Sequence, residues 1–118
     1  MKVADLTGAQ LDYWVARAEG YPLSCDWNQG GYILIGTGAG DLERFAPSTD
    51  WADGGPIIQQ ALISVLHGPI DDPHGVDFWT GFIRPSDDEG YDGTTPLIAA
   101  MRAYVASKFG NEVPGENI

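Results

Sequence analysis

The chain has 118 residues, with six Lys and Arg against seventeen Asp and Glu, which gives a formal net charge of −11. This length suits one domain, and 43% hydrophobic residues are enough for a packed core. The acidic balance excludes a generic nucleic-acid binder, because such proteins use clustered Lys and Arg to neutralise phosphates. It also excludes an anionic membrane surface as a partner, since the two would repel.

A first helix is predicted over residues 8–19. Thr7-Gly8-Ala9-Gln10 has the form of a capping box, in which a threonine oxygen accepts from an amide of the first turn and a glutamine reaches back. Apolar residues then recur at helical spacing, at Leu11, Trp14, Val15 and Ala18. Gly20 is the expected stop.

Three strands are predicted, over residues 32–35, 62–66 and 76–83. The first is a short apolar run with glycines on both sides. The loop between the other two contains Gly-Pro and Asp-Pro pairs, so an antiparallel hairpin is the simplest connection.

Short helical turns are predicted within residues 48–60. The first turn, through Trp51, has three candidate N-caps in Ser48, Thr49 and Asp50. Gly54-Gly55 is expected to interrupt, and Pro56 is well placed to begin a second short helix.

The last long helix is predicted to begin at Pro96, with Thr95 as its N-cap, and to stop at Gly110. Residues 85–93 before it read as an acidic loop, and residues 112–118 after it read as a flexible tail. One apolar stripe is expected, formed by Ile98, Met101, Val105 and Phe109, with Leu97 and Tyr104 beside it.

The predicted elements define a small single domain, residues 1–118, of the α+β class. It has an N-terminal helix, a three-stranded and mostly antiparallel sheet with short helical turns at 48–60, and a long C-terminal helix. Each long helix has one apolar face, which is buried most economically on one face of the sheet.

The ends and the cysteine content favour the cytoplasm. The first residues lack the apolar region of a secretory signal, and no apolar run approaches the roughly 20 residues that span a bilayer. Cys25 is the only cysteine, so no internal disulfide is expected. We interpret Cys25 as a half-buried thiol beside Trp27, because no activating neighbour adjoins it in sequence, rather than as a nucleophile assisted by a histidine.

Several motifs resemble functional signatures without meeting their requirements. The glycines of residues 36–40 lack the spacing and the following helix of a dinucleotide-binding turn. Residues 87–93 fail as a calcium loop, because Gly90 and Ala99 fall where ligands are needed. Residues 71–77 are a looser acidic cluster. We therefore predict no catalytic residue, metal site or cofactor.

Two sequence blocks carry a family resemblance. They are residues 47–58, PSTDWADGGPII, and residues 95–110, TPLIAAMRAYVASKFG, with a weaker third block at residues 6–12, LTGAQLD. The chain resembles the phage NinX-like family, small proteins of unknown function from the accessory gene regions of tailed phages and prophages. The resemblance implies a phage origin and an accessory role in the cytoplasm of the infected bacterial host, and it brings no established activity.

Both main blocks fall on predicted helix N-termini, which suit anions because their amides are unpaired and the helix dipole is positive there. Trp51 could stack on a base and Arg102 could supply a cation. The candidate ligand-binding residues are Ser48, Thr49, Trp51, Gly54, Gly55, Thr94, Thr95 and Arg102. A purely structural interpretation stays open, in which the glycines build turns, Thr95 only caps its helix and Trp51 belongs to the core.

Two functions compete, and a third, an enzyme, is disfavoured because no catalytic constellation is found. The first is a non-catalytic phage accessory protein that binds and sequesters a small anionic, nucleotide-like ligand, such as a host defence signal. The alternative is an acidic inhibitor of a host or defence protein with a basic surface, since a charge of −11 steers a small domain toward such surfaces. Homo-oligomerisation is open in either case.

Overall fold

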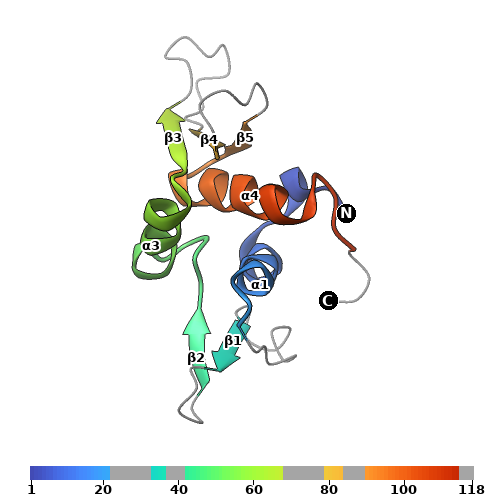
Figure 1. The fold of residues 1–118 in the computed structure, drawn as a ribbon, viewed down its shortest axis with the longest axis vertical. Helices are drawn as coiled ribbons and strands as arrows, with labels where there is room; N and C mark the ends of the chain where they lie inside the picture. Colours follow the sequence, from blue (N-terminus) through green and yellow to red (C-terminus); the bar gives the residue numbers. More distant parts are fainter. Residues whose placement is uncertain (22–32, 37–41, 68–78, 84–89, 115–118) are drawn as a thin grey trace.

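A computed structural model describes residues 1–21, 33–36, 42–67, 79–83 and 90–114 and shows an α+β protein, as the sequence predicts (Figure 1). The elements in chain order are η1 (Val3–Asp5), α1 (Gly8–Glu19), β1 (Ile33–Gly36), β2 (Leu42–Phe45), α3 (Trp51–Ala61), β3 (Ser64–His67), β4 (Trp79–Phe82), β5 (Tyr91–Gly93) and α4 (Pro96–Phe109). The predictions for Cys25, for the glycines of 37–40 and for the acidic residues of 71–77 and 87–89 lie outside the described residues.

Helix α4 crosses the middle of the molecule, between the three-stranded sheet and α1 (Figure 1). Its buried residues are Leu97, Ala99, Ala100, Met101, Ala103, Tyr104 and Val105. Of the predicted apolar stripe and its neighbours, Leu97, Met101, Tyr104 and Val105 are buried as expected, but burial extends beyond one stripe because η1, α1, α3 and the sheet all contact α4. Phe109, at one end of the predicted stripe, is 39% exposed.

The three-stranded sheet is antiparallel, in the order β3-β4-β5. Its third strand, β5, comes from residues predicted as an acidic loop. The predicted first strand is real but lies elsewhere, because β1 pairs with β2 in a separate two-stranded sheet. Strand β5 lies so close to α4 that a Cβ on Gly93 would be 2.6 Å from the Ala99 nitrogen. Glycine therefore permits this packing.

Helix α3 is continuous from Trp51 to Ala61, so the prediction of two short turns is wrong. Asp50 is the N-cap, and its side chain accepts a hydrogen bond from the Ala52 amide at 2.9 Å. Pro56 lies inside the helix, although proline removes an intrahelical hydrogen bond. Tertiary packing offsets this cost, since Gly54 and Ile57 are both buried.

The local signals of the other helices are mostly confirmed. Helix α1 has the predicted bounds and ends at Gly20 in the left-handed conformation. Thr7 is its N-cap by position, but its side chain makes no capping hydrogen bond, so that half of the predicted capping box is absent. Thr95 caps α4 as predicted, with Oγ1 accepting from the Ile98 amide at 3.1 Å.

The two ends of the described chain pair with one another. The Met1 ammonium donates to the Val113 carbonyl at 2.7 Å, and the Val113 amide donates back to the Met1 carbonyl at 2.8 Å. Val113 is buried, and Glu112 forms a β-bridge with Lys2. Residues 112 and 113, expected as the start of a flexible tail, are thus tied to the N-terminus, and residues 115–118 lie outside the described part.

One buried carboxylate joins α1 to the segment before α3. Asp12 is 3% exposed and accepts a hydrogen bond from the Ser48 amide at 2.8 Å. Burial raises the pKa of Asp12 from 3.8 to about 6, with a smaller contribution from the charge of Asp53. The Ser48 amide, the Ser48 side chain and Arg44 favour the charged form, but they only partly oppose this effect.

We predict that Asp12→Asn removes a pH dependence of stability. Between pH 3.8 and about 6 the folded protein holds a proton on Asp12 that the unfolded chain has lost, so the contribution of Asp12 to stability falls as pH rises through this window. The asparagine oxygen can still accept from the Ser48 amide without a buried charge. Relative to the variant, the parent should lose about 2–3 kcal/mol of unfolding free energy between pH 4 and pH 7, measured by urea denaturation.

Glu43→Gln, an exposed position, is the matched control for the loss of one negative charge. A difference between parent and Asp12→Asn that stays constant with pH would contradict the prediction.

Candidate functional site

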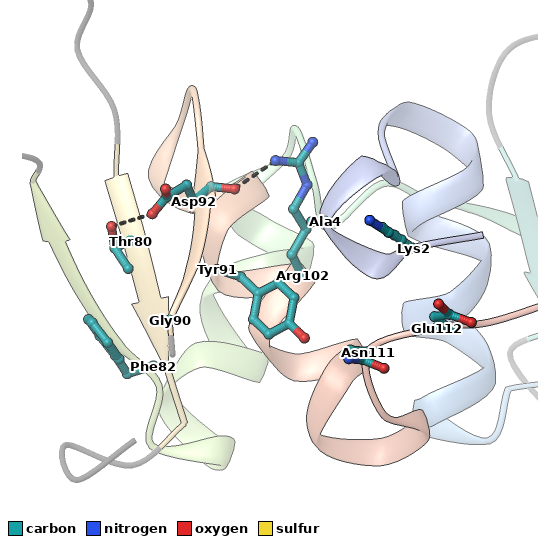
Figure 2. A pocket seen from close by; sticks show the side chains of 10 residues that line it. All are labelled: Lys2, Ala4, Thr80, Phe82, Gly90, Tyr91, Asp92, Arg102, Asn111 and Glu112. Carbon is teal, nitrogen blue, oxygen red and sulfur yellow. Dashed lines mark hydrogen bonds between the residues drawn. The ribbon is translucent and has the colours of Figure 1, made fainter. Parts of the chain in front are cut away.

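A cavity of about 710 Å³ lies where the N-terminal segment, strands β4 and β5, and helix α4 meet. It is lined by Lys2, Ala4, Thr80, Phe82, Gly90, Tyr91, Asp92, Arg102, Asn111 and Glu112. Figure 2 shows the β4 and β5 side chains on one side, the two chain ends on the other and Arg102 rising from α4 between them. The pairing of the chain ends therefore builds one wall of the cavity.

Arg102 is the fixed point of this cavity. Its Nε donates to the Leu6 carbonyl at 3.0 Å, and its Nη1 donates to the Asp92 carbonyl at 2.6 Å. These bonds fix the guanidinium between the N-terminal segment and β5, and they use two of its five N–H donors. Burial lowers the pKa of Arg102, opposed by the charges of Asp5 and Asp92. An arginine nevertheless stays protonated at neutral pH.

The charges around the cavity are mixed. Lys2 and Arg102 are two of the six basic residues of the whole chain, and both line it. Asp92 and Glu112 line it as well. The Asp92 carboxylate accepts a hydrogen bond from the Thr80 hydroxyl at 2.7 Å, which directs part of its charge toward β4 (Figure 2). A ligand here would meet two cations, two carboxylates and neutral polar groups.

A second, smaller cavity of about 260 Å³ also borders Arg102. It is lined by Asp92, Gly93, Thr94 and Arg102. Asp92 and Arg102 thus border both cavities. Of the predicted site residues, the structure brings Thr94 and Arg102 together here.

The start of α4 offers few amides to an anion. The Thr95 hydroxyl already accepts from the Ile98 amide, and the Ala99 amide donates to the Thr95 carbonyl. Pro96 has no N–H. Thr95 therefore serves as a cap in this structure, which agrees with the structural interpretation of that residue.

The start of α3 carries carboxylates where an anion site was predicted. Asp50 accepts from the Ala52 amide, and the Asp53 carboxylate accepts from the Ala46 amide at 2.9 Å. Ser48 is 1% exposed and Gly54 is buried. Two negative charges at this helix end disfavour an anionic ligand.

Trp51 and Gly55 line neither of the two cavities that Arg102 borders. Trp51 is 56% exposed, and the residue after it, Ala52, lines a third cavity of about 360 Å³ together with Asp53 and Arg44. The two family blocks do meet, because Gly54 lies against the Leu97 side chain. This contact only packs α3 against α4. Near it, Ala52 and Asp53 of the first block line the third cavity, whereas Arg102 of the second block lines the other two.

Sequence reasoning missed Lys2, Thr80, Tyr91 and Asn111 as site residues. They come from four separate segments, and no spacing rule connects them. Tyr91 was part of a predicted loop, because no local sequence pattern predicts that it lies on a strand beside α4.

Two structural findings concern other kinds of site. Among the described residues, no group of three or more His, Cys, Asp or Glu is arranged to hold a metal ion. The helices in the described part of the chain are all too short or too polar to cross a membrane.

The fold and the cavity define a small α+β protein with a polar, partly cationic cavity built around its C-terminal helix. The family follows from the sequence: residues 2–108 match the family model described as Bacteriophage P22, NinX, so the chain belongs to this phage family. The predicted resemblance is therefore confirmed, and with it the general role of a phage accessory protein. A search of curated proteins finds no match.

We predict unequal effects for alanine at the adjacent glycines of α3. A Cβ on Gly54 would lie 2.5 Å from the Pro47 carbonyl oxygen and 2.7 Å from Leu97 Cδ2, so Gly54→Ala should cost about 1–3 kcal/mol. A Cβ on Gly55 would meet only Trp51, at 3.9 Å. Gly55 directly precedes Pro56, and a proline ring disfavours the helical conformation of a preceding residue that has a Cβ, so this cost offsets the gain in helix propensity and Gly55→Ala should change stability by less than about 1 kcal/mol.

Urea denaturation of the two variants measures both effects, and each variant is the control for the other. Equal losses of stability would show that Gly54 is not the residue on which the contact between α3 and α4 depends.

Proposed function

We propose that this phage accessory protein binds and sequesters a small anionic, nucleotide-like ligand in the cavity beside Arg102. The observation that carries the proposal is the meeting of Lys2 and Arg102 on one cavity of a chain with a net charge of −11. Such a chain repels anions almost everywhere, so a site for one needs local cations together with directed hydrogen-bond donors.

Arg102 is suited to a phosphate because it is already oriented. Its bonds to the Leu6 and Asp92 carbonyls hold the guanidinium in place before any ligand arrives. A preorganised donor loses less entropy on binding than a free side chain. Lys2 adds a second positive charge from the opposite wall (Figure 2).

The other walls suit a base and a sugar. The rings of Phe82 and Tyr91 come from adjacent strands and both border the cavity, with Tyr91 on the side of Arg102 and Phe82 on the opposite side of the strands (Figure 2). Aromatic faces stack on bases of any identity. Asn111 adds an amide that can donate or accept. A volume of about 710 Å³ lies within the range of roughly 300–1,000 Å³ that small-molecule sites occupy.

The site in this proposal keeps part of the predicted residue set. Thr94 and Arg102 remain candidate ligand contacts. The surroundings of Ser48, Thr49, Trp51, Gly54 and Gly55 give no support to an anion site at the start of α3, and the capping bond of Thr95 gives none to a site at the start of α4. The proposal has three further parts. The protein acts in the cytoplasm of the infected host, the ligand is a host defence signal, and the protein can form homo-oligomers.

We predict that ADP binds the parent protein and that binding weakens when either cation is removed. Arg102→Gln should weaken binding at least tenfold, because a charge-assisted hydrogen bond is lost, and Lys2→Gln should weaken it severalfold. Isothermal titration calorimetry at low ionic strength measures both, and the affinity should fall as salt increases.

Lys108→Gln is the matched control, since it removes the same charge from the last turn of α4, where Lys108 lies over the Tyr104 ring. Arg102→Gln also removes structural bonds, so Lys2→Gln provides the independent test, with circular dichroism to verify folding. Failure of ADP to bind, or an equal loss in all three variants, would overturn the proposal.

A second candidate function is the acidic inhibitor of a protein with a basic surface. Beyond the net charge, the described residues that line the third cavity include three carboxylates against one cation: Glu19, Glu43 and Asp53 with Arg44, beside the aromatic rings of Tyr21 and Phe45. This face is suited to lysine or arginine side chains of a partner. Pull-down from host lysate at low and high salt tests it, and a partner retained equally at both salt concentrations would contradict the electrostatic mechanism.

A further inference from the structure

The two cavities beside Arg102 share part of their lining. Arg102 and Asp92 line both of them, Tyr91 in β5 lines the larger one, and Thr94, directly after β5, lines the smaller one. A ligand whose phosphate contacts Arg102 therefore borders both cavities.

The two cavities differ in size, and each suits a different part of a ligand. The larger one, at about 710 Å³, is big enough for a nucleoside with its phosphate. The smaller one, at about 260 Å³, is a shallow, open depression below the usual size of a complete small-molecule site, against which a sugar-sized group can lie. The smaller cavity therefore suits an extension of the ligand.

We propose that the ligand is a two-part nucleotide, in which one or two phosphates at Arg102 join a nucleoside in the larger cavity to a second, sugar-sized group in the smaller one. This inference rests on the proposed function. It adds the requirement that the far side of the phosphate is esterified.

The chemistry of the smaller cavity supports this choice. Asp92 and Thr94 are exposed, and both line it. A carboxylate accepts hydrogen bonds from sugar hydroxyls, and a threonine hydroxyl both donates and accepts. The same carboxylate repels a free terminal phosphate, whose negative charge is greater than that of an esterified one. The smaller cavity thus favours a neutral polyhydroxyl group.

The test compares ADP-ribose with ADP by isothermal titration calorimetry on the parent protein and on Thr94→Val. The parent should bind ADP measurably and ADP-ribose at least tenfold more tightly, although ADP-ribose carries less negative charge. Thr94→Val, which keeps the shape of the side chain and removes its hydroxyl, should weaken the binding of ADP-ribose severalfold more than the binding of ADP, so that the preference for ADP-ribose falls.

The outcomes separate the two proposals. Equal or tighter binding of ADP would overturn the two-part ligand and leave the anion site at Arg102 standing. A preference for ADP-ribose that Thr94→Val does not change would also overturn it, because the second group would then lie outside the smaller cavity. No binding of either compound would overturn both proposals.

Discussion

The burial of helix α4 on several sides is the constraint on which the rest of the structure depends. A central helix needs neighbours all round, and here η1, α1, α3 and the three-stranded sheet supply them. Close approach of strands to this helix requires residues without side chains: a Cβ on Gly81 or Gly93 would lie 2.6 Å from the backbone of Ala99. The small residues of α4 and the glycines of β4 and β5 therefore act together.

The same constraint explains the position of Arg102. An arginine in the middle of a largely buried helix must satisfy its donors locally, because an unpaired buried charge is costly. The Leu6 and Asp92 carbonyls meet that need and, in doing so, join the N-terminal segment to β5 across α4. The cavity forms beside this junction, so its walls come from distant parts of the chain.

Local signals in the sequence predicted the helix ends well, since Thr95 and Gly20 act within a few residues of their own positions. The continuation of α3 through Pro56 was missed, because tertiary packing overrides a local break. Strand β5 was missed because its three residues, Tyr91–Gly93, are too few to show an alternating pattern and form a strand only by pairing with β4. For the site, Arg102 was predicted as a cation, but its partner carbonyl at Leu6 is 96 residues away and no sequence pattern connects them.

The most direct test of the anion site is to map its position by nuclear magnetic resonance, titrating ¹⁵N-labelled protein with pyrophosphate. The account predicts that the Arg102 Nε–H signal and the amides of Tyr91 and Thr94 shift together and saturate, while the amides of Gly54 and Gly55 stay unchanged. Shifts centred on Gly54 and Gly55, or a titration without saturating shifts near Arg102, would contradict the account.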